Sequence, residues 1–316
     1  MKAFLFISKQ GDGCALANRI MSEGHRSILY INVKKNRRVG DGIVEKSSIS
    51  EELILRDGRV RWGILDQLLK TNPDVVVMDM VGRGFGKVAE RIRELGVPVV
   101  GGSVFGNTVE LNRPYGSQVM KMMGIPVPET HVFNGFPEAI RFIESSKGAY
   151  VYKPSGNKPT HTTYVANGKE DMVGMLKHYS GQRGEFGLQK RVSGIEVSTE
   201  LWFNGKEVLN VNHTMEEKSL MDNGIGAKTG SMGSVVWEGH QDSRLYRVID
   251  KELEEQSKLC KGRITVALSI LTQSSQKVNC MVLSSQQDLA TTLSSPSLKD
   301  TEVKSLTSCM GLQQAS

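Results

Sequence analysis

Short, continuous runs of apolar residues alternate with amphipathic segments over the first hundred residues. Apolar runs at 3–8, 27–33, 72–79 and 96–101 predict strands, and apolar residues at helical spacing lie between them. Because the strand runs are continuous, both faces of the sheet should be covered. The pattern therefore predicts an α/β domain with a parallel sheet over residues 1–105.

From about residue 106 the pattern changes to that of an α+β region. Helical spacing at 110–123 and 137–146 is followed by strand-like runs joined by short turns, among them Asn204-Gly205. The predicted strands lie at residues 150–154, 162–165, 186–192, 196–203 and 207–212. This region, residues 106–261, is predicted to form two subdomains, at about 106–185 and 186–261.

Composition narrows the class of protein. The chain has 316 residues, 39% hydrophobic and 23% charged, and its four cysteines form no C-x-x-C pair. No apolar window is long enough for a membrane span, and the apolar N-terminal run is too short for a signal peptide. These features predict a soluble cytoplasmic protein with no membrane partner, no disulfide framework and no zinc site.

The net charge is +6, but the basic residues are scattered except at Lys34, Lys35, Arg37 and Arg38. No aromatic residues interleave with that cluster, so we expect no nucleic-acid partner. The cluster is either a solvated loop or a phosphate contact.

The segment from Lys218 to Gly233 is rich in glycine, lysine and hydroxyl side chains. Glycines let backbone N–H groups approach a ligand, so such a segment can form an anion cradle. The alternative is a surface loop that joins two strands.

Gly11 and Gly13 follow the first predicted strand, but Leu16 occupies the third glycine position of a dinucleotide fingerprint. The pair fits a tight strand-to-helix turn or a phosphate-binding helix N-terminus. The hypothesis that the chain is a dinucleotide-binding oxidoreductase rests on this glycine pair alone.

Lys153 ends an apolar strand beside a polar loop, and Glu196 begins a later strand after an extended segment. A cation there can hold phosphate, an extended backbone can bind an adenine edge, and a carboxylate can accept from ribose hydroxyls. Ordinary strand residues are the alternative for both.

Together with the Gly226-Ala-Lys-Thr-Gly-Ser-Met-Gly233 motif, this order of residues resembles the ATP-grasp ligases, and most closely the phosphoribosylamine–glycine ligase family. The resemblance extends through Leu95–Ser103, Val109–Arg113 and Met123–Pro126, and it covers roughly residues 1–240. It implies a Rossmann-like N-terminal domain followed by an ATP-grasp fold, and a ligase of purine biosynthesis that works through an acyl phosphate.

The resemblance also assigns residues. It implies that Arg113 and Lys153 grip ATP phosphates, that Glu196 holds the ribose, and that the adenine lies against Gln189, Lys190, Arg191 and Val192. The implied acceptor-substrate loop contains Lys218, Gly226, Thr229, Gly230, Ser231, Met232 and Gly233. For Arg113 the alternative is a surface charge at a helix start.

ATP with Mg²⁺ or Mn²⁺, glycine or another carboxylate, and phosphoribosylamine or another amine are the implied ligands. The chain departs from the family pattern in two places. Asp79-Met-Val-Gly82 replaces the family's Gly-Pro-Glu, and Lys228 replaces an asparagine of the glycine-rich motif. A non-catalytic ATP-binding relative is therefore the alternative function.

The last part of the chain, residues 262–316, is rich in Ser, Thr and Gln, and no aromatic residue follows Tyr246. It reads as a disordered tail or an aberrant segment. Residues Cys280–Ala290 can be back-translated with codons that the genetic code permits for them. When the same bases are read in the frame that begins at the third base of the Cys280 codon, they encode Tyr-Gly-Leu-Glu-Phe-Thr-Ala-Arg-Phe-Gly. That peptide is close to the Leu-Glu-Phe-Asn-x-Arg-Phe-Gly strand that supplies the family's metal ligands.

The same shifted frame can encode Asp-Tyr-Arg-Gly-Ala-Leu-Asp-Ile upstream, starting at Arg263. Downstream it can encode Tyr-Asp-Ala-Ile-Phe-Ala, ending at Pro296. We therefore hypothesise that a frameshift near Lys261 made residues 262–316 an out-of-frame translation. On this hypothesis the metal-binding strand is missing, so no metal ligand is assigned in this chain.

Overall fold

The structure is a computed structural model that describes most of the first 247 residues and two short backbone segments after them. The described residues are 1–79, 82–122, 125–154, 163–181, 184–192, 195–203, 208–226, 228–240, 242–247, 267–274 and 279–281.

The first domain is a five-stranded parallel sheet with strand order β3-β2-β1-β4-β5, which confirms the predicted α/β class. Its strands are β1 (Ala3–Ser8), β2 (Arg26–Ile31), β3 (Glu45–Lys46), β4 (Val75–Val77) and β5 (Val99–Val100). Its helices are α1 (Cys14–Ser22), η1 (Lys34–Asn36), α2 (Trp62–Leu69) and α3 (Phe85–Glu94).

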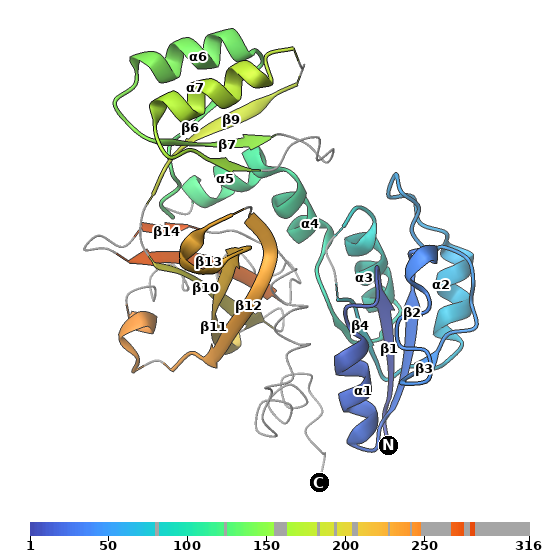
Figure 1. Ribbon diagram of the computed structural model, residues 1–316. Coiled ribbons are helices and arrows are strands. Elements are labelled where there is room, and N and C mark those ends of the chain that lie inside the picture. The colour runs from blue at the N-terminus through green and yellow to red at the C-terminus, as the bar shows by residue number, and fades with distance from the viewer. Residues whose placement is uncertain are drawn as a thin grey trace.

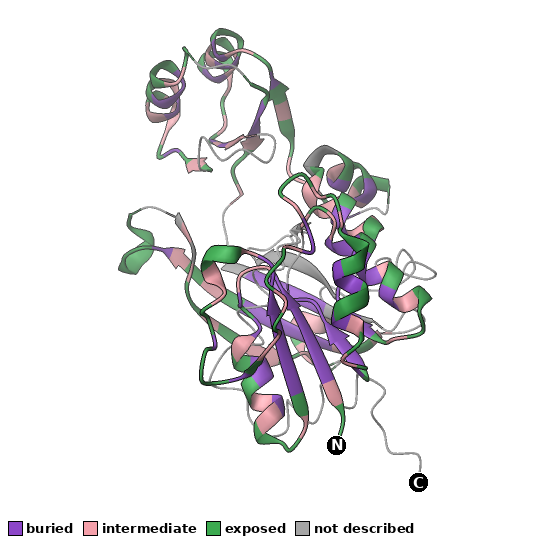
Figure 2. Ribbon diagram, turned by 90° about the vertical axis from the view of Figure 1, so that its right-hand side faces the viewer, coloured by how far each residue is buried: buried purple, intermediate pink, exposed green. Residues whose placement is uncertain are grey.

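Both faces of this sheet are buried, as the continuous apolar strands predict (Figure 2). Leu5 and Ile7 belong to the core formed with α2 and α3, whereas Phe4 and Phe6 belong to the core formed with α1. The alternation of side chains along β1 thus divides one strand between two cores.

The helix predicted at 110–123 corresponds to α5 (Arg113–Met122), and it is preceded by α4 (Val104–Leu111), which overlaps the predicted range only at its last two residues. The chain breaks at Asn112 because Pro114 cannot continue a helix from the preceding turn. The side chain of Asn112 accepts a hydrogen bond from the Tyr115 N–H at 3.1 Å and so caps the second helix.

A four-stranded antiparallel sheet follows, with strand order β6-β9-β7-β8. Helices α6 and α7 cover one of its faces (Figure 1). Its elements are β6 (Thr130–Phe133), α6 (Phe136–Ser145), β7 (Tyr150–Pro154), β8 (Tyr164–Val165), α7 (Lys169–His178) and β9 (Phe186–Lys190). The short strand β6 and the helix α7 were not predicted from the sequence.

The third unit is a sheet of order β12-β11-β10-β13-β14, antiparallel throughout. Its elements are β10 (Ile195–Phe203), β11 (Val208–Ser219), η2 (Asp222–Gly224), β12 (Lys228–Glu238), β13 (Ala267–Ser274) and β14 (Asn279–Met281). The predicted Asn204-Gly205 turn lies outside the described residues. Trp202 of β10 packs into the core that α1 forms with the first sheet.

Strands β13 and β14 fall within the tail that the sequence predicts to be disordered or aberrant. The backbone of β13 pairs along β10 from Ile195↔Ser274 to Trp202↔Ala267. The backbone of residues 267–274 and 279–281 thus lies in strands beside β10. The rest of the predicted tail lies outside the described residues.

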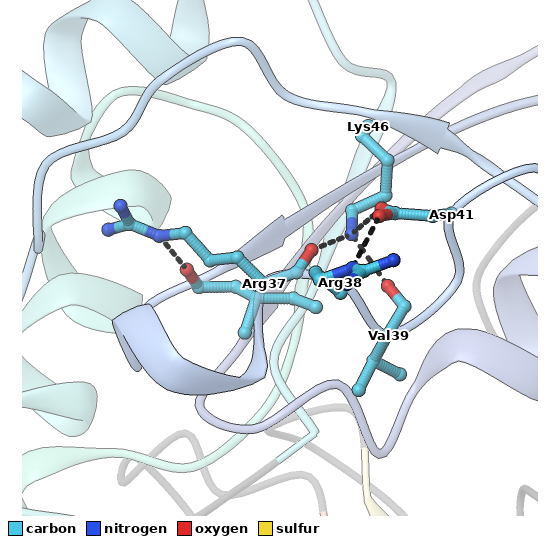
Figure 3. A network of polar contacts seen from close by, with 6 residues as sticks. Arg37, Arg38, Val39, Asp41 and Lys46 are labelled. Atoms are coloured by element: carbon cyan, nitrogen blue, oxygen red, sulfur yellow. Dashed lines mark hydrogen bonds and ion pairs between the residues drawn. The ribbon is translucent and has the colours of Figure 1, made fainter.

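The basic cluster near residue 37 lies in a loop that is fixed by its own backbone (Figure 3). The Lys46 ammonium donates to the carbonyl oxygens of Arg37 and Val39 and lies 3.3 Å from Asp41. Arg37 donates to the carbonyls of Ile31 and Ser50. This structure favours the solvated-loop interpretation, because Arg37 is used to hold the loop together.

The described residues contain no helix that is both long and apolar enough to cross a membrane.

Candidate functional site

The residues assigned to the nucleotide lie on neighbouring strands of the small sheet and on the chain that leaves it. In the β7–β9 pair, Val151 faces Gln189 and Lys153 faces Gly187. The intervening residues Tyr152 and Leu188 are buried against α6 and α7. Since side chains alternate along a strand, Lys153 and Gln189 share the sheet face turned away from these helices.

Lys190 and Arg191 lie differently. The register pairs Lys190 with Tyr150, so its side chain is on the helix side of the sheet. The Arg191 guanidinium donates to the carbonyl of Ala166 at 3.1 Å. The Arg191 side chain is thus bound to the backbone of the small sheet's own chain, whereas the Lys190 side chain is exposed on the helix side.

The remaining nucleotide residues are placed only by their backbone. Arg113 is the first residue of α5, and Glu196 is the second residue of β10. Their side chains lie outside what the structure describes, as does the polar loop after Lys153, at residues 155–162. Their assigned roles stay predictions.

The glycine-rich segment is a β-hairpin and not an extended loop. Lys218 is the last residue but one of β11, while Thr229 through Gly233 belong to β12, where Gly233 pairs with Glu217. The described residues between the two strands are 220–226, in which Gly224 and Gly226 have positive φ angles of 75° and 87°. The alternative of two strands joined by a loop is thus the closer description.

Polar side chains of this hairpin are engaged within it. The Thr229 hydroxyl donates to the Lys218 carbonyl at 3.1 Å, and the Ser231 hydroxyl donates to the Gly233 carbonyl at 3.1 Å. The Lys218 ammonium lies 3.1 Å from the Glu216 carboxylate. Met232 is half exposed. The side chain of Lys228 and the surroundings of Gly230 lie outside what the structure describes. An anion at this hairpin would have to compete with Glu216 for Lys218.

The N-terminus of α1 is already capped by a carboxylate. The Gly13 N–H donates to Asp79 Oδ2 at 2.6 Å, and a Cβ at Gly13 would lie 2.9 Å from that oxygen. Burial raises the pKa of Asp79 to about 6, although the hydrogen bonds to its carboxylate oppose the shift. The tight-turn interpretation of Gly11 and Gly13 is favoured, because Asp79 occupies the place of a bound phosphate.

A buried polar chain that the sequence analysis missed joins β10 to β11. The Trp202 indole donates to Asn212 Oδ1 at 2.7 Å, and the Asn212 amide donates to Glu200 Oε2 at 2.6 Å. Glu200 is fully buried, and burial raises its pKa to about 7. The signal in the sequence is a glutamate in the middle of the strand predicted at 196–203, a position that apolar residues usually hold.

On the other face of the same strands, His213 Nδ1 lies 2.9 Å from the Thr199 hydroxyl. Burial lowers the pKa of His213 to about 4, so the ring is neutral at physiological pH. This pair is a structural contact between β10 and β11.

The described residues do not fit a metal site. They contain no group of three or more His, Cys, Asp or Glu side chains placed to hold an ion. On the frameshift hypothesis, the family's metal-ligand strand would be encoded in the other reading frame under residues 280–290, of which only Cys280 and Met281 are described, by their backbone.

The second part of the chain is similar to a known protein family. Residues 112–259 match the family model described as phosphoribosylglycinamide synthetase, ATP-grasp (A) domain. The match includes every residue assigned above to the nucleotide and to the glycine-rich hairpin.

Individual relatives agree with the family model. A phosphoribosylamine–glycine ligase of Halalkalibacterium halodurans is 26% identical over 153 residues, 46% of this chain and 36% of that protein. A phosphoribosylamine–glycine ligase of Methanosarcina barkeri is 23% identical over 265 residues, 82% of this chain and 59% of that protein. This chain thus spans between about a third and three fifths of the length of these relatives.

Solved structures agree with the fold. The crystal structure of phosphoribosylamine–glycine ligase from Thermotoga maritima superposes with a TM-score of 0.59 at 18% identity, covering 91% of this chain and 70% of that one. The predicted order, a Rossmann-like domain followed by an ATP-grasp fold, is confirmed.

Proposed function

We propose that this chain is a form of an ATP-dependent carboxylate–amine ligase, because residues 112–259 match the model of the phosphoribosylglycinamide synthetase ATP-grasp domain. The substrates would be glycine and phosphoribosylamine, joined through an acyl phosphate in the cytoplasm. The observation that carries the proposal is the family match over residues 112–259, which includes Lys153 and Gln189 on one face of the small sheet.

The proposed roles follow from charge and position. The ammonium of Lys153 would neutralise phosphate oxygens, and the backbone of residues 189–192 would bind the adenine edge. Glu196 would accept hydrogen bonds from the ribose hydroxyls, and Arg113 would supply a second cation. Alignment and neutralisation of charge are the main tasks of a protein in phosphoryl transfer, so no protein nucleophile is needed.

Turnover requires more than the described residues supply. The described residues contain no group of side chains placed to bind a metal ion. We propose that the family's metal-binding strand was lost through the frameshift near Lys261. We therefore expect nucleotide binding by this chain, and ligation by the chain whose frame is restored after Lys261. The comparisons do not favour a non-catalytic relative or an oxidoreductase as the origin of the chain.

The test is ADP release in the presence of Mg²⁺, ATP, glycine and phosphoribosylamine, measured for the frame-restored chain and for the chain in its present form. The restored chain should release ADP only when both substrates are present, and the present chain should release at least about 100-fold less, since the metal stabilises several kcal/mol of developing charge. A restored chain that binds ATP without any ADP release contradicts the proposal.

A further inference from the structure

The small sheet carries a pair of polar side chains, Thr130 and Gln189, on the face turned away from its helices. Thr130 of β6 and Gln189 of β9 are direct cross-strand partners, and Lys153 lies on the same face. Thr130 is exposed and Gln189 is half-buried. Val132, two residues further along β6, is 54% exposed, whereas its neighbour Phe133 packs toward the helices. This face of the sheet is therefore accessible.

The Thr130 hydroxyl decides how the Gln189 amide is turned. Thr130 Oγ1 donates to the Pro128 carbonyl oxygen at 3.1 Å, and Gln189 Nε2 donates to the same Oγ1 at 3.1 Å. A hydroxyl has a single proton, and a carbonyl oxygen can only accept. Since the proton of Thr130 is used on Pro128, Oγ1 can only accept from Gln189. The opposite orientation of the amide would bring two acceptors together.

Gln189 Oε1 is therefore an acceptor whose direction is fixed. It lies on the other branch of the amide from Nε2, so it is turned away from Thr130. A fixed acceptor binds a donor and rejects another acceptor. At position 6 of a purine, adenine has an amino group, which donates, whereas guanine and hypoxanthine have a carbonyl oxygen, which accepts.

The surroundings of Gln189 fit a contact with a base. Lys153, which we propose to hold phosphate, pairs with Gly187, two residues before Gln189 on β9. The two ends of a nucleotide would then be held on one face of the sheet. Gly187 also makes room for the polar pair, because a Cβ at this position would lie only 3.1 Å from Thr130 Cγ2.

We propose that Thr130 is a positioning residue that makes Gln189 selective for a purine with an amino group at position 6. The inference rests on the proposed ligase function, which supplies the nucleotide on this face. Gln189 would contact the base, and Thr130 would act only through Gln189. Without the hydroxyl, the amide can turn over and offer Nε2 to a carbonyl oxygen, so selectivity is lost while binding is kept.

The test is titration of the full chain with ATP and with ITP, whose base is hypoxanthine. The parent should bind ATP about 10-fold more tightly or better, because a site built to accept a hydrogen bond rejects an analogue without the donor. Thr130→Val, which has nearly the same shape, should bind ITP more tightly than the parent does. The two affinities should then agree within about 3-fold. Damage to the fold cannot produce a gain in ITP binding.

Two variants separate the orientation of the amide from packing. Thr130→Ser keeps the hydroxyl and should keep the preference for ATP. The double variant Thr130→Val, Gln189→Glu should recover the preference, since a carboxylate accepts in either orientation. Ser145→Ala is the matched control, because it removes an exposed hydroxyl that donates to the Phe142 carbonyl on α6. It should bind both nucleotides as the parent does.

Three results would overturn the inference: equal binding of ATP and ITP by the parent, an unchanged preference in Thr130→Val, or a lost preference in Thr130→Ser. In each case ATP still binds, so the proposed function stands. A parent that binds neither nucleotide would overturn the proposed function, and the inference with it.

Discussion

Asp79 is a buried carboxylate that caps a helix and receives no charge partner among the described side chains. It is 2% exposed, its Oδ2 accepts the Gly13 N–H, and its Oδ1 has no hydrogen-bond partner among the described residues. Burial raises its pKa from 3.8 to about 6. An acid whose pKa is higher in the folded state stabilises the fold below the unfolded pKa, and this contribution is lost as pH rises through the folded value.

We therefore expect Asp79→Asn to stabilise the protein at neutral pH. Asparagine still accepts the Gly13 N–H and carries no charge, so the free energy of unfolding should rise by up to about 3 kcal/mol above pH 6.5. Below pH 4 the variant and the parent should be equally stable. Urea unfolding at a series of pH values between 4 and 8 measures this difference.

Asp74 supplies the control, since it also accepts a backbone N–H, from Ala3 at 2.7 Å, but is exposed. Because the Asp74 carboxylate stays in water, Asp74→Asn should not raise the free energy of unfolding at neutral pH. If Asp79→Asn were less stable than the parent at every pH, the ionised carboxylate would be a stabilising cap, and our account of its burial would be incorrect.

Among single residues, the sequence identified Lys153 by its place at the end of an apolar strand, and the structure places it on a shared face with Gln189. It could not identify Glu200 or Asp79 as buried polar groups. Asp79 follows an apolar run and Glu200 interrupts one. Whether their carboxylates are buried or solvated depends on tertiary packing, which the sequence pattern does not give.

At the scale of elements, the strands of the first domain were predictable because each is a continuous apolar run between turn residues. The glycine-rich hairpin was less predictable. Gly230 and Gly233 lower strand propensity, yet the segment pairs with β11 along most of its length because the neighbouring strand supplies the hydrogen bonds. The helix α7 was missed although its buried residues Met172, Met175 and Leu176 have the i, i+3, i+4 spacing of an amphipathic helix.

The break between α4 and α5 shows a related limit. Apolar spacing continues across Asn112, so periodicity alone predicts one helix at 110–123. Pro114 decides the outcome, because its ring is incompatible with the interior of a helix and compatible with its first turn. A stricter use of the proline signal would have found this boundary.

At the scale of the whole molecule, the C-terminal segment decides whether the site is complete. The backbone of β13 occupies the sheet position beside β10, and Ser269 faces Glu200 in the register. In the regrouped reading the same stretch contains Ala-Leu-Asp-Ile. A frameshift would therefore have replaced a strand that brings an acid to this sheet with one that brings hydroxyl and apolar residues.

The frameshift hypothesis predicts the bases of the gene. Those under Cys280–Ala290 should regroup to encode Tyr-Gly-Leu-Glu-Phe-Thr-Ala-Arg-Phe-Gly, and a reading frame that continues past Ser316 should contain further sequence resembling the family. Sequencing the gene measures this directly. Bases that do not regroup in this way would mean that residues 262–316 are translated in the same frame as the rest of the chain, and the frameshift hypothesis would be incorrect.

The central claim, that this chain holds an ATP-grasp nucleotide site, is tested most directly by titration of the full chain with ATP. We predict one binding site whose affinity falls by about 10-fold or more in Lys153→Ala, as expected when a charged hydrogen bond to phosphate is removed. Lys147→Ala, at an exposed lysine before β7, should bind ATP as the parent does. The absence of ATP binding by the folded parent, or equal affinity of Lys153→Ala and the parent, would contradict the account.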